Sequence, residues 1–257
     1  MIYPFIILQS INNILDSFEP ISLEQMDSVQ LMNRTDTKFV FELELLGKVL
    51  NEIREHYYVL DINNKRMSAY RSLYYDTDDF EFYFEHHNGK TNRNKVRYRE
   101  YIDSGLCFLE IKHKTNKGKT IKKRIKVDKI PNEIDTNANA FITSVIGKEK
   151  ELVPKHWNKF NRITLVNKKM KERLTIDVNI NFEGDNKTSE LENMVIAEVK
   201  QEKINYASAF MRIIKKNMVR PFRISKYCMA TASLYPLLKN NNFKPKFLKI
   251  NKLQHDA

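Results

Sequence analysis

The chain has 257 residues, of which 42% are hydrophobic, so it can fold around a sizeable core and is not a disordered tail. Its 44 Lys and Arg against 32 Asp and Glu give a formal net charge of +12, which favours anionic partners. The two cysteines and six histidines lack the spacing of a disulfide framework or a zinc site, which fits a reducing, cytoplasmic compartment. No segment approaches the ~20 apolar residues of a spanning helix. The apolar N-terminus up to Leu15 is expected to pack as a terminal segment, with a cleaved signal peptide as the alternative.

The first third of the chain carries clear helix and strand signals. Ser22 followed by Gln25 has the spacing of a capping box and predicts a short helix through about Leu31. Apolar residues at helical spacing predict a second helix over residues 44–56. Strands are predicted over residues 39–41 and 70–75, the latter ending in a turn at residues 76–79.

The rest of the chain predicts mostly antiparallel sheet. Short links at residues 103–105 and 116–118 should join three strands into two hairpins. A helix over residues 137–146 should end at Gly147. These signals predict one α+β domain over residues 1–238 and a basic tail, 239–257, that we expect to fray. The strands are predicted over residues 95–102, 106–114, 120–127, 159–167, 172–181 and 194–201, and two further helices over residues 206–216 and 226–238.

The positive charge is concentrated in one segment. Residues 90–126 contain 13 Lys or Arg and 3 Asp or Glu, a local balance of +10. Side chains of a strand alternate between two faces, so each predicted strand here has an apolar face and a cationic face. The residues that share cationic faces are Lys95, Arg97 and Arg99; Glu110, Lys112 and Lys114; Lys122, Arg124 and Lys126; and, farther along, Arg173, Thr175 and Asp177, and Glu198 and Lys200.

Two interpretations of these faces are open. An antiparallel sheet often has one solvated side, so the cations could simply point outward. However, like charges directly across neighbouring strands repel, and a solvated face normally mixes both signs. A closed barrel that turns the cationic faces inward would form a polar tunnel whose repulsion a bound polyanion would relieve. Phosphate suits such a tunnel because its oxygens accept charge-assisted hydrogen bonds from Arg and Lys, and a carboxylate there could bind a divalent cation.

Nine motifs in order along the chain carry a family resemblance. They are NRTDTKFVF (33–41), YYDT (74–77), KVRYREY (95–101), LEIKHK (109–114), KKR (122–124), FNR (160–162), RLTID (173–177), AEVK (197–200) and ISKY (224–227). The set resembles the VTC domain, the polyphosphate polymerase branch of the triphosphate tunnel metalloenzyme (CYTH-like) superfamily, in its stand-alone, bacterial-type form. The resemblance runs from about Phe18 to Leu238.

The resemblance implies an α+β fold built on an antiparallel β-barrel tunnel with flanking helices. It implies transfer of the γ-phosphate of ATP to a growing polyphosphate chain, with Mn²⁺ or Mg²⁺ as the cofactor and no specific nucleic-acid partner. Glu198 would be the metal ligand, and Lys95, Glu110, Lys200 and Ser225 would lie in the substrate-binding motifs, with Lys95 at a tunnel mouth. The resemblance assigns phosphate binding and catalysis to Lys38, Arg97, Arg99, Lys112, Arg124, Arg162, Arg173 and Lys226.

Two alternatives to the polymerase stay open. A tunnel triphosphatase would use water as the acceptor, but such relatives carry paired acids in an ExE motif where this chain has Thr35-Asp36-Thr37-Lys38, with Lys38 expected inward. A protein that binds polyanions without catalysis is the other alternative.

Three residues are expected to have lesser roles. Many relatives have Tyr where this chain has Phe160, so a hydroxyl contact is lost there. Asp76 and Asp177 are expected to serve turn formation and strand pairing rather than metal binding.

Overall fold

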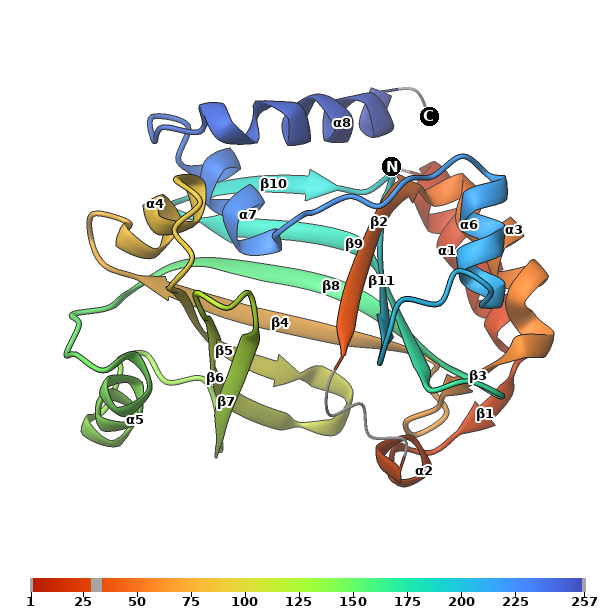
Figure 1. Cartoon of the computed structure of the whole chain (residues 1–257), viewed down its shortest axis with the longest axis horizontal. Helices are drawn as coiled ribbons and strands as arrows, with labels where there is room; N and C mark the ends of the chain where they lie inside the picture. Colours follow the sequence, from red (N-terminus) through yellow and green to blue (C-terminus); the bar gives the residue numbers. More distant parts are fainter. Residues whose placement is uncertain (1, 29–33, 256–257) are drawn as a thin grey trace.

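The computed structural model describes residues 2–28 and 34–255, which form an eleven-stranded sheet flanked by helices (Figure 1). Eight strands lie in the order β2-β11-β9-β8-β4-β5-β6-β7, and every pairing along this path is antiparallel. Their bounds are β2 Thr35–Glu42, β4 Met67–Asp76, β5 Arg93–Tyr101, β6 Leu106–Lys114, β7 Thr120–Val127, β8 Val153–Asn167, β9 Glu172–Gly184 and β11 Met194–Gln201. The short strands β1 Glu19–Ile21, β3 Tyr57–Leu60 and β10 Lys187–Leu191 extend the sheet at its sides.

The sheet is strongly curved but its two edges do not pair. Figure 1 shows β2 and β7 both in front of β4 and β8, so the sheet wraps around its concave face. Within the described residues no strand pairing joins β2 to β7, so the expected closed barrel is an open, curved sheet. The reason lies at β2, whose free edge is already occupied. The Phe222 amide donates to the Lys38 carbonyl at 2.7 Å, and Pro221 forms a bridge with Phe39.

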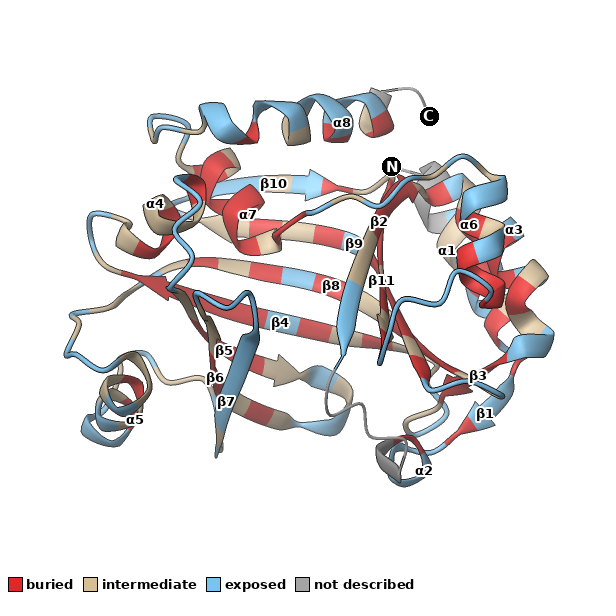
Figure 2. Cartoon of the chain, viewed as in Figure 1, coloured by how far each residue is buried: buried red, intermediate tan, exposed pale blue. Residues whose placement is uncertain are grey.

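Helices cover the convex side and one end of the sheet. The helices α1 Ile2–Leu15, α3 Leu43–Ile53 and α6 Ala209–Lys216 share one apolar cluster with β2, β8, β9 and β11. The helices α4 Glu81–His87, α7 Lys226–Leu234 and α8 Lys244–His255 share a second cluster, and α5 Thr136–Ile146 covers β5 and β6 in a third. Helix α2 Leu23–Ser28 and the 3-10 turns Arg54–His56, Ile102–Ser104 and Asn241–Phe243 complete the described elements. Figure 2 shows buried residues on the strands and on the faces of α6 and α7.

Local chemistry explains several element ends. The predicted capping box forms, because the Ser22 amide donates to the Gln25 side chain at 2.9 Å and the Gln25 amide donates to the Ser22 hydroxyl at 3.2 Å. Helix α2 is described to Ser28, and its predicted end near Leu31 lies outside the described residues. Helix α5 ends at Gly147, whose φ of +84° suits a residue without a side chain.

Two predictions about the C-terminal region are wrong. Helix α7 ends at Leu234 instead of residue 238, because the proline at position 236 disfavours helical backbone in the residue before it. The segment after residue 238, expected to fray, forms helix α8. Ile250 and Leu253 are only 3% and 2% exposed, since they pack into the second apolar cluster. Burial of these two side chains stabilises the helix.

Candidate functional site

The concave face of the sheet gathers the predicted site residues of the strands. Residues directly paired on antiparallel strands point to the same side, so the strand register identifies each face. Lys38 pairs with Glu198, which pairs with Thr175, and the same face continues across β8 and β4 to β5, β6 and β7. We call this the inner face. It carries eleven predicted residues: Lys38, Lys95, Arg97, Arg99, Glu110, Lys112, Arg124, Arg162, Arg173, Glu198 and Lys200.

On β5, β6 and β7 the inner face contains a fully buried acid between cations. Glu110 has no exposed surface and accepts from Arg97 Nη2 at 2.6 Å and Nε at 3.0 Å. Lys122 forms an ion pair with the same carboxylate. One register step away, Lys95, Lys112 and Lys122 lie side by side across the three strands. The Glu110 carboxylate is therefore surrounded by more cationic side chains than it can neutralise.

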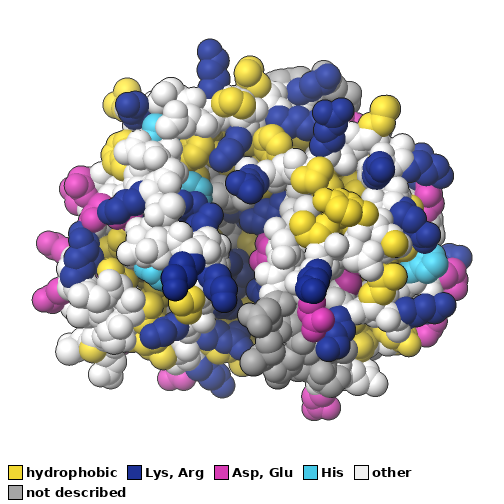
Figure 3. All heavy atoms as spheres, in the orientation of Figure 1, with side chains coloured by type: hydrophobic (Ala, Val, Ile, Leu, Met, Phe, Trp, Pro, Cys, Tyr) yellow, Lys and Arg dark blue, Asp and Glu magenta, His cyan; other side chains and the backbone are white. Residues whose placement is uncertain are grey.

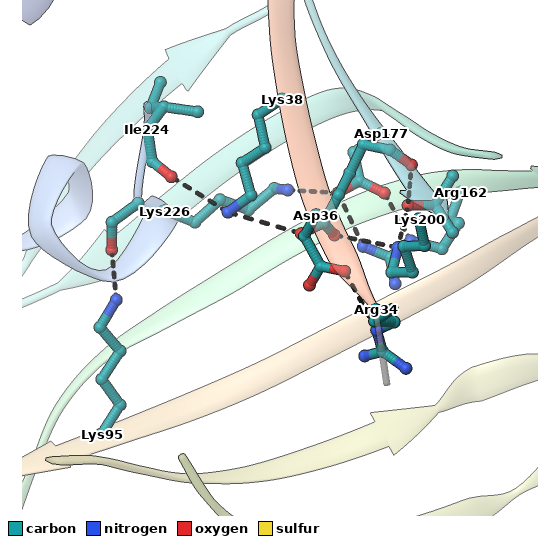
Figure 4. A network of polar contacts seen from close by, with 12 residues as sticks. Arg34, Asp36, Lys38, Lys95, Arg162, Asp177, Lys200, Ile224 and Lys226 are labelled. Atoms are coloured by element: carbon teal, nitrogen blue, oxygen red, sulfur yellow. Dashed lines mark hydrogen bonds and ion pairs between the residues drawn. The ribbon is translucent and has the colours of Figure 1, made fainter. Parts of the chain in front are cut away.

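On β8, β9 and β11 two further acids are each held by two cations. Asp177 accepts from Arg162 Nε at 2.6 Å and Nη2 at 2.8 Å, and also from Lys226. Glu198 lies 3.0 Å from the Lys200 amine and 3.8 Å from the Lys38 amine. Figure 4 shows the Asp177 side chain meeting Arg162 next to Lys38 and Lys200.

The surrounding cations keep these acids ionised. Burial by itself would raise the pKa of each carboxyl group, since it penalises the charged form. The charges of Arg97, Arg99 and Lys122 outweigh burial and hold the pKa of Glu110 below its ordinary value. The pKa of Glu198 is likewise lowered well below its ordinary value, by Lys200, Lys38 and Lys112. Arg162 and Lys226 lower the pKa of Asp177 in the same way.

The N-terminus of α7 crosses the open side of the sheet and completes the site. Ser225 caps the helix by accepting from the Cys228 amide, and it also accepts from the Lys95 amine at 2.8 Å. The Lys38 amine donates to the Ile224 carbonyl at 3.1 Å. Residues 224–226, at the start of α7, therefore link β2, β5 and β9 (Figure 4).

Burial, together with neighbouring cations, lowers the pKa of several amines. Burial, with a further contribution from nearby Lys38, lowers the pKa of Lys95 to about 8. Burial also lowers the pKa of Lys226 to about 8, although Asp177 partly opposes it. The pKa of Lys112 falls well below its ordinary value through burial and the charge of Arg97. The negative charge of a bound polyanion would favour the protonated form of these amines.

Two predicted residues lie at the margins of the inner face. Arg124 is exposed on the edge strand β7, with its guanidinium 4.4 Å from the centre of the Phe108 ring. Arg173 donates to the Met26 carbonyl of α2 at 3.1 Å, so it lies toward that end of the sheet. Figure 3 shows a hollow at the centre of this side of the molecule, with Lys and Arg side chains gathered around it.

The sequence analysis missed three contributors. Asp177 was assigned to strand pairing, yet it organises Arg162 and Lys226. Alternation placed Lys122 on the same face as Arg124, but no site role was assigned to it, and it forms an ion pair with Glu110. Phe160 lacks the hydroxyl of its counterpart in relatives, but its ring stacks on Tyr70 at 5.4 Å and lies 4.5 Å from the Lys226 amine.

The available side chains limit how a metal ion could be bound at the inner face. No group of three or more His, Cys, Asp or Glu side chains suited to a metal ion occurs among residues 2–28 and 34–255. Glu198 offers one ionised carboxylate on the inner face. Mg²⁺ in phosphate-handling enzymes is commonly bound by one or two carboxylates together with substrate phosphates. The residues therefore fit a metal that the substrate helps to hold.

Comparisons with known proteins agree with the resemblance. Residues 33–235 match the model of the VTC domain. A search of curated proteins finds no match. In the part of the chain that the structure describes, no helix is long and apolar enough to cross a membrane.

One solved structure shows the same fold. A proposed adenylyl cyclase from Hippeastrum with a dominant triphosphatase activity is 13% identical, with a TM-score of 0.51 over 79% of this chain and 96% of that one. Proposed adenylate cyclases from Bacillus halodurans and Vibrio parahaemolyticus are 12% and 10% identical, with TM-scores of 0.49 and 0.47. The Bacillus alignment covers 76% of this chain and 96% of that one, and the Vibrio alignment covers 77% of this chain and 99% of that one.

Proposed function

The chain belongs to the VTC-domain family, and we propose that it is a metal-dependent polyphosphate polymerase that transfers the γ-phosphate of ATP to a growing polyphosphate chain. The observation that carries the proposal is the charge arrangement of the inner face. Its buried acids, Glu110 and Asp177, and the partly buried Glu198 each contact two cationic side chains, and Lys95 and Lys112, paired across β5 and β6, add further amines to the same face. Such a face suits a reaction in which both the donor and the acceptor present phosphate groups to the site.

The proposed reaction needs mainly position and charge neutralisation. An oxygen of the terminal phosphate of the acceptor attacks the γ-phosphorus of ATP. The bond from that phosphorus to the oxygen bridging to the β-phosphate breaks, and ADP leaves with the electron pair. The acceptor oxygen is already ionised at neutral pH, so no general base is required. Arg97, Arg99 and Arg162 would hold the phosphates in line and stabilise the charge that develops.

A divalent metal fits one place in this scheme. Glu198 would hold Mn²⁺ or Mg²⁺ jointly with substrate phosphate oxygens, and the metal would neutralise part of their charge. Lys38 and Lys200, which now neutralise Glu198, would then be free to contact the same phosphates. This exchange of partners requires no carboxylate beyond Glu198.

Strand β2 supports phosphate rather than water as the acceptor. Asp36 and Lys38 both lie on the inner face, opposite Lys200 and Glu198 respectively. The sequence analysis expected only Lys38 there. The strand thus presents one acid and one cation where tunnel triphosphatases present two acids, and Asp36 forms an ion pair with Arg34 at 3.0 Å. Fewer free carboxylates remain to bind metal and orient water.

The direct test is a product assay. Purified protein incubated with ATP and Mn²⁺ or Mg²⁺ should form long polyphosphate, with one ADP per phosphate incorporated. Release of phosphate from ATP without polymer would overturn the proposal and favour a triphosphatase.

Glu198→Gln separates an enzyme from a simple binder. The variant should lose turnover but keep or gain affinity for tripolyphosphate, because one negative charge leaves the inner face. Glu183→Gln is the matched control: Glu183 pairs with Lys159 on the opposite face of β8 and β9 and should leave turnover unchanged. If the parent protein binds tripolyphosphate but forms no product with either metal, it is a binding protein.

A further inference from the structure

The ends of β5 and β6 that lie next to α7 carry a second group of cations. Arg93 is two residues before Lys95, so it continues the inner face, and it is paired directly with Lys114. Two more cations come from outside the sheet: Arg223 precedes α7, and Lys246 is on α8. We call Arg93, Lys114, Arg223 and Lys246 the outer basic cluster.

The members of the cluster lie close enough to affect one another. Partial burial lowers the pKa of Lys114, and the charges of Arg93 and Arg223 lower it further. Partial burial likewise lowers the pKa of Lys246, to which Arg93 and Lys38 also contribute. Lys246 on α8 therefore lies within electrostatic reach of both β5 and β2, across the open side of the sheet.

His86 lies near the cluster, and its pKa is lowered by burial and by cations of the cluster. Burial, Lys95, Arg93 and Lys246 together lower the pKa of His86 to about 2. Its Nδ1 atom is buried and has no hydrogen-bond partner among the described residues. The surroundings thus strongly disfavour another positive charge.

The outer basic cluster differs from the inner face because acids do not neutralise it. None of its four cations forms an ion pair with an acid in the described parts of the chain. Arg93 donates to the Lys90 carbonyl, and the Lys246 amine lies 4.7 Å from the centre of the Phe243 ring. Cross-strand cations without a counter-charge are unfavourable, so an anion is the missing partner.

We propose that the outer basic cluster is a binding subsite for the part of a polyphosphate chain that extends beyond the inner face. The inference rests on the proposed function, since it assigns the path of that reaction's acceptor or product. Arg93 is four residues from Arg97, about 13 Å along the strand. A triphosphate bound at Arg97 is shorter than this span, whereas a longer chain reaches the cluster.

The lining favours polyphosphate over single-stranded nucleic acid. Proteins that bind single strands combine cations with exposed aromatic rings on which bases stack. Phe243, whose ring centre lies 4.7 Å from the Lys246 amine, is only 2% exposed, so its faces are covered. A ligand made only of phosphate needs no such platform.

The test compares two inorganic ligands, tripolyphosphate and polyphosphate of about one hundred units, by equilibrium binding without ATP. The parent should bind the long chain more tightly per molecule. The double variant Arg223→Met with Lys246→Met should weaken long-chain binding about tenfold and leave tripolyphosphate binding within twofold. Lys244→Met is the matched control, because Lys244 is exposed on α8 and about 200° around the helix from Lys246. It should change neither affinity.

Several results would overturn the inference. One is equal weakening of both ligands in the double variant, and another is no weakening of either. A third is the same loss in Lys244→Met, which would indicate net charge rather than a site. A single-stranded oligonucleotide of matched charge that binds as tightly and responds as strongly would replace polyphosphate with nucleic acid. Selective loss of long-chain binding supports the subsite even if the product assay finds only phosphate release, and polymer formation without that loss refutes the subsite alone.

Discussion

Binding of tripolyphosphate at pH 8 should take up protons, because the free site contains incompletely protonated lysines. Lys95 and Lys226 have pKa values of about 8, lowered first by burial and then by neighbouring cations. A bound polyanion opposes the effect of the neighbouring cations, since it supplies negative charge at the amines and so favours their protonated form. Their pKa values therefore rise on binding, and each amine gains the proton it lacked.

The expected size follows from these values. At pH 8 a group with a pKa of about 8 is about half protonated, so full protonation of Lys95 and Lys226 takes up about one proton per ligand. Lys112, whose pKa is lowered further, adds to this number. By linkage the affinity must fall as pH rises, by about tenfold per lysine between pH 7 and pH 9 if the bound-state pKa returns to its ordinary value. The two lysines together give about a hundredfold.

Calorimetry at pH 8 in two buffers of different ionisation enthalpy measures the uptake, since the observed heat varies with the number of protons drawn from the buffer. Lys226→Arg keeps the charge but removes the titration, so uptake should fall by about half a proton. Lys159→Arg, on the opposite face in contact with Glu183, is the control and should leave uptake unchanged. Absence of uptake in the parent, or unchanged uptake in Lys226→Arg, would refute the reasoning.

Three further changes test the packing and the charge balance. Glu110→Gln should destabilise the protein by about 3–5 kcal/mol in chemical unfolding, because it leaves Arg97 and Lys122 without their shared buried acid, and added tripolyphosphate should restore much of the loss. Asp76→Asn should cost about 3 kcal/mol, because that carboxylate accepts three backbone amides and one phenol, and an unchanged unfolding midpoint would contradict its structural role. Leu253→Ala should cost about 2–5 kcal/mol if α8 is an integral part of the fold, whereas a change near zero would indicate a detachable tail.

Alternation along single strands allowed much of the site to be predicted. The period of two that separates Arg97 and Arg99 from their apolar neighbours is set by local backbone geometry, so it can be read without knowing the fold. The strands β5, β6 and β7 lie within one or two residues of their predicted bounds for the same reason. Tight links between them also fix their register, because short hairpins leave few alternatives.

Features that depend on distant contacts could not be predicted in this way. The pairing of Asp177 with Lys226 joins residues that are far apart in the sequence, and no local signal encodes it. The occupation of the β2 edge by Pro221 and Phe222 is equally non-local, and it replaced the expected closure of the barrel. Helix α8 forms because Leu253 packs into the second apolar cluster, whereas the tail from residue 239 is rich in Lys and Asn and gives only weak helical signals.

The lowered lysine pKa values also connect stability with ligand binding. A shift from the ordinary value to about 8 means that keeping Lys95 charged in the folded protein at pH 7 costs about 3 kcal/mol relative to the unfolded chain. Lys226 carries a similar cost. These costs are large beside the net stability of a typical domain, so they would be selected against unless something offset them. A polyanion that binds only the folded state offsets them, because its negative charge favours the protonated amines and its binding stabilises the fold by mass action. The inner face is thus expected to be least stable when empty, and the gain in unfolding midpoint on adding tripolyphosphate should shrink in Lys95→Met, whose neutral side chain carries no such cost.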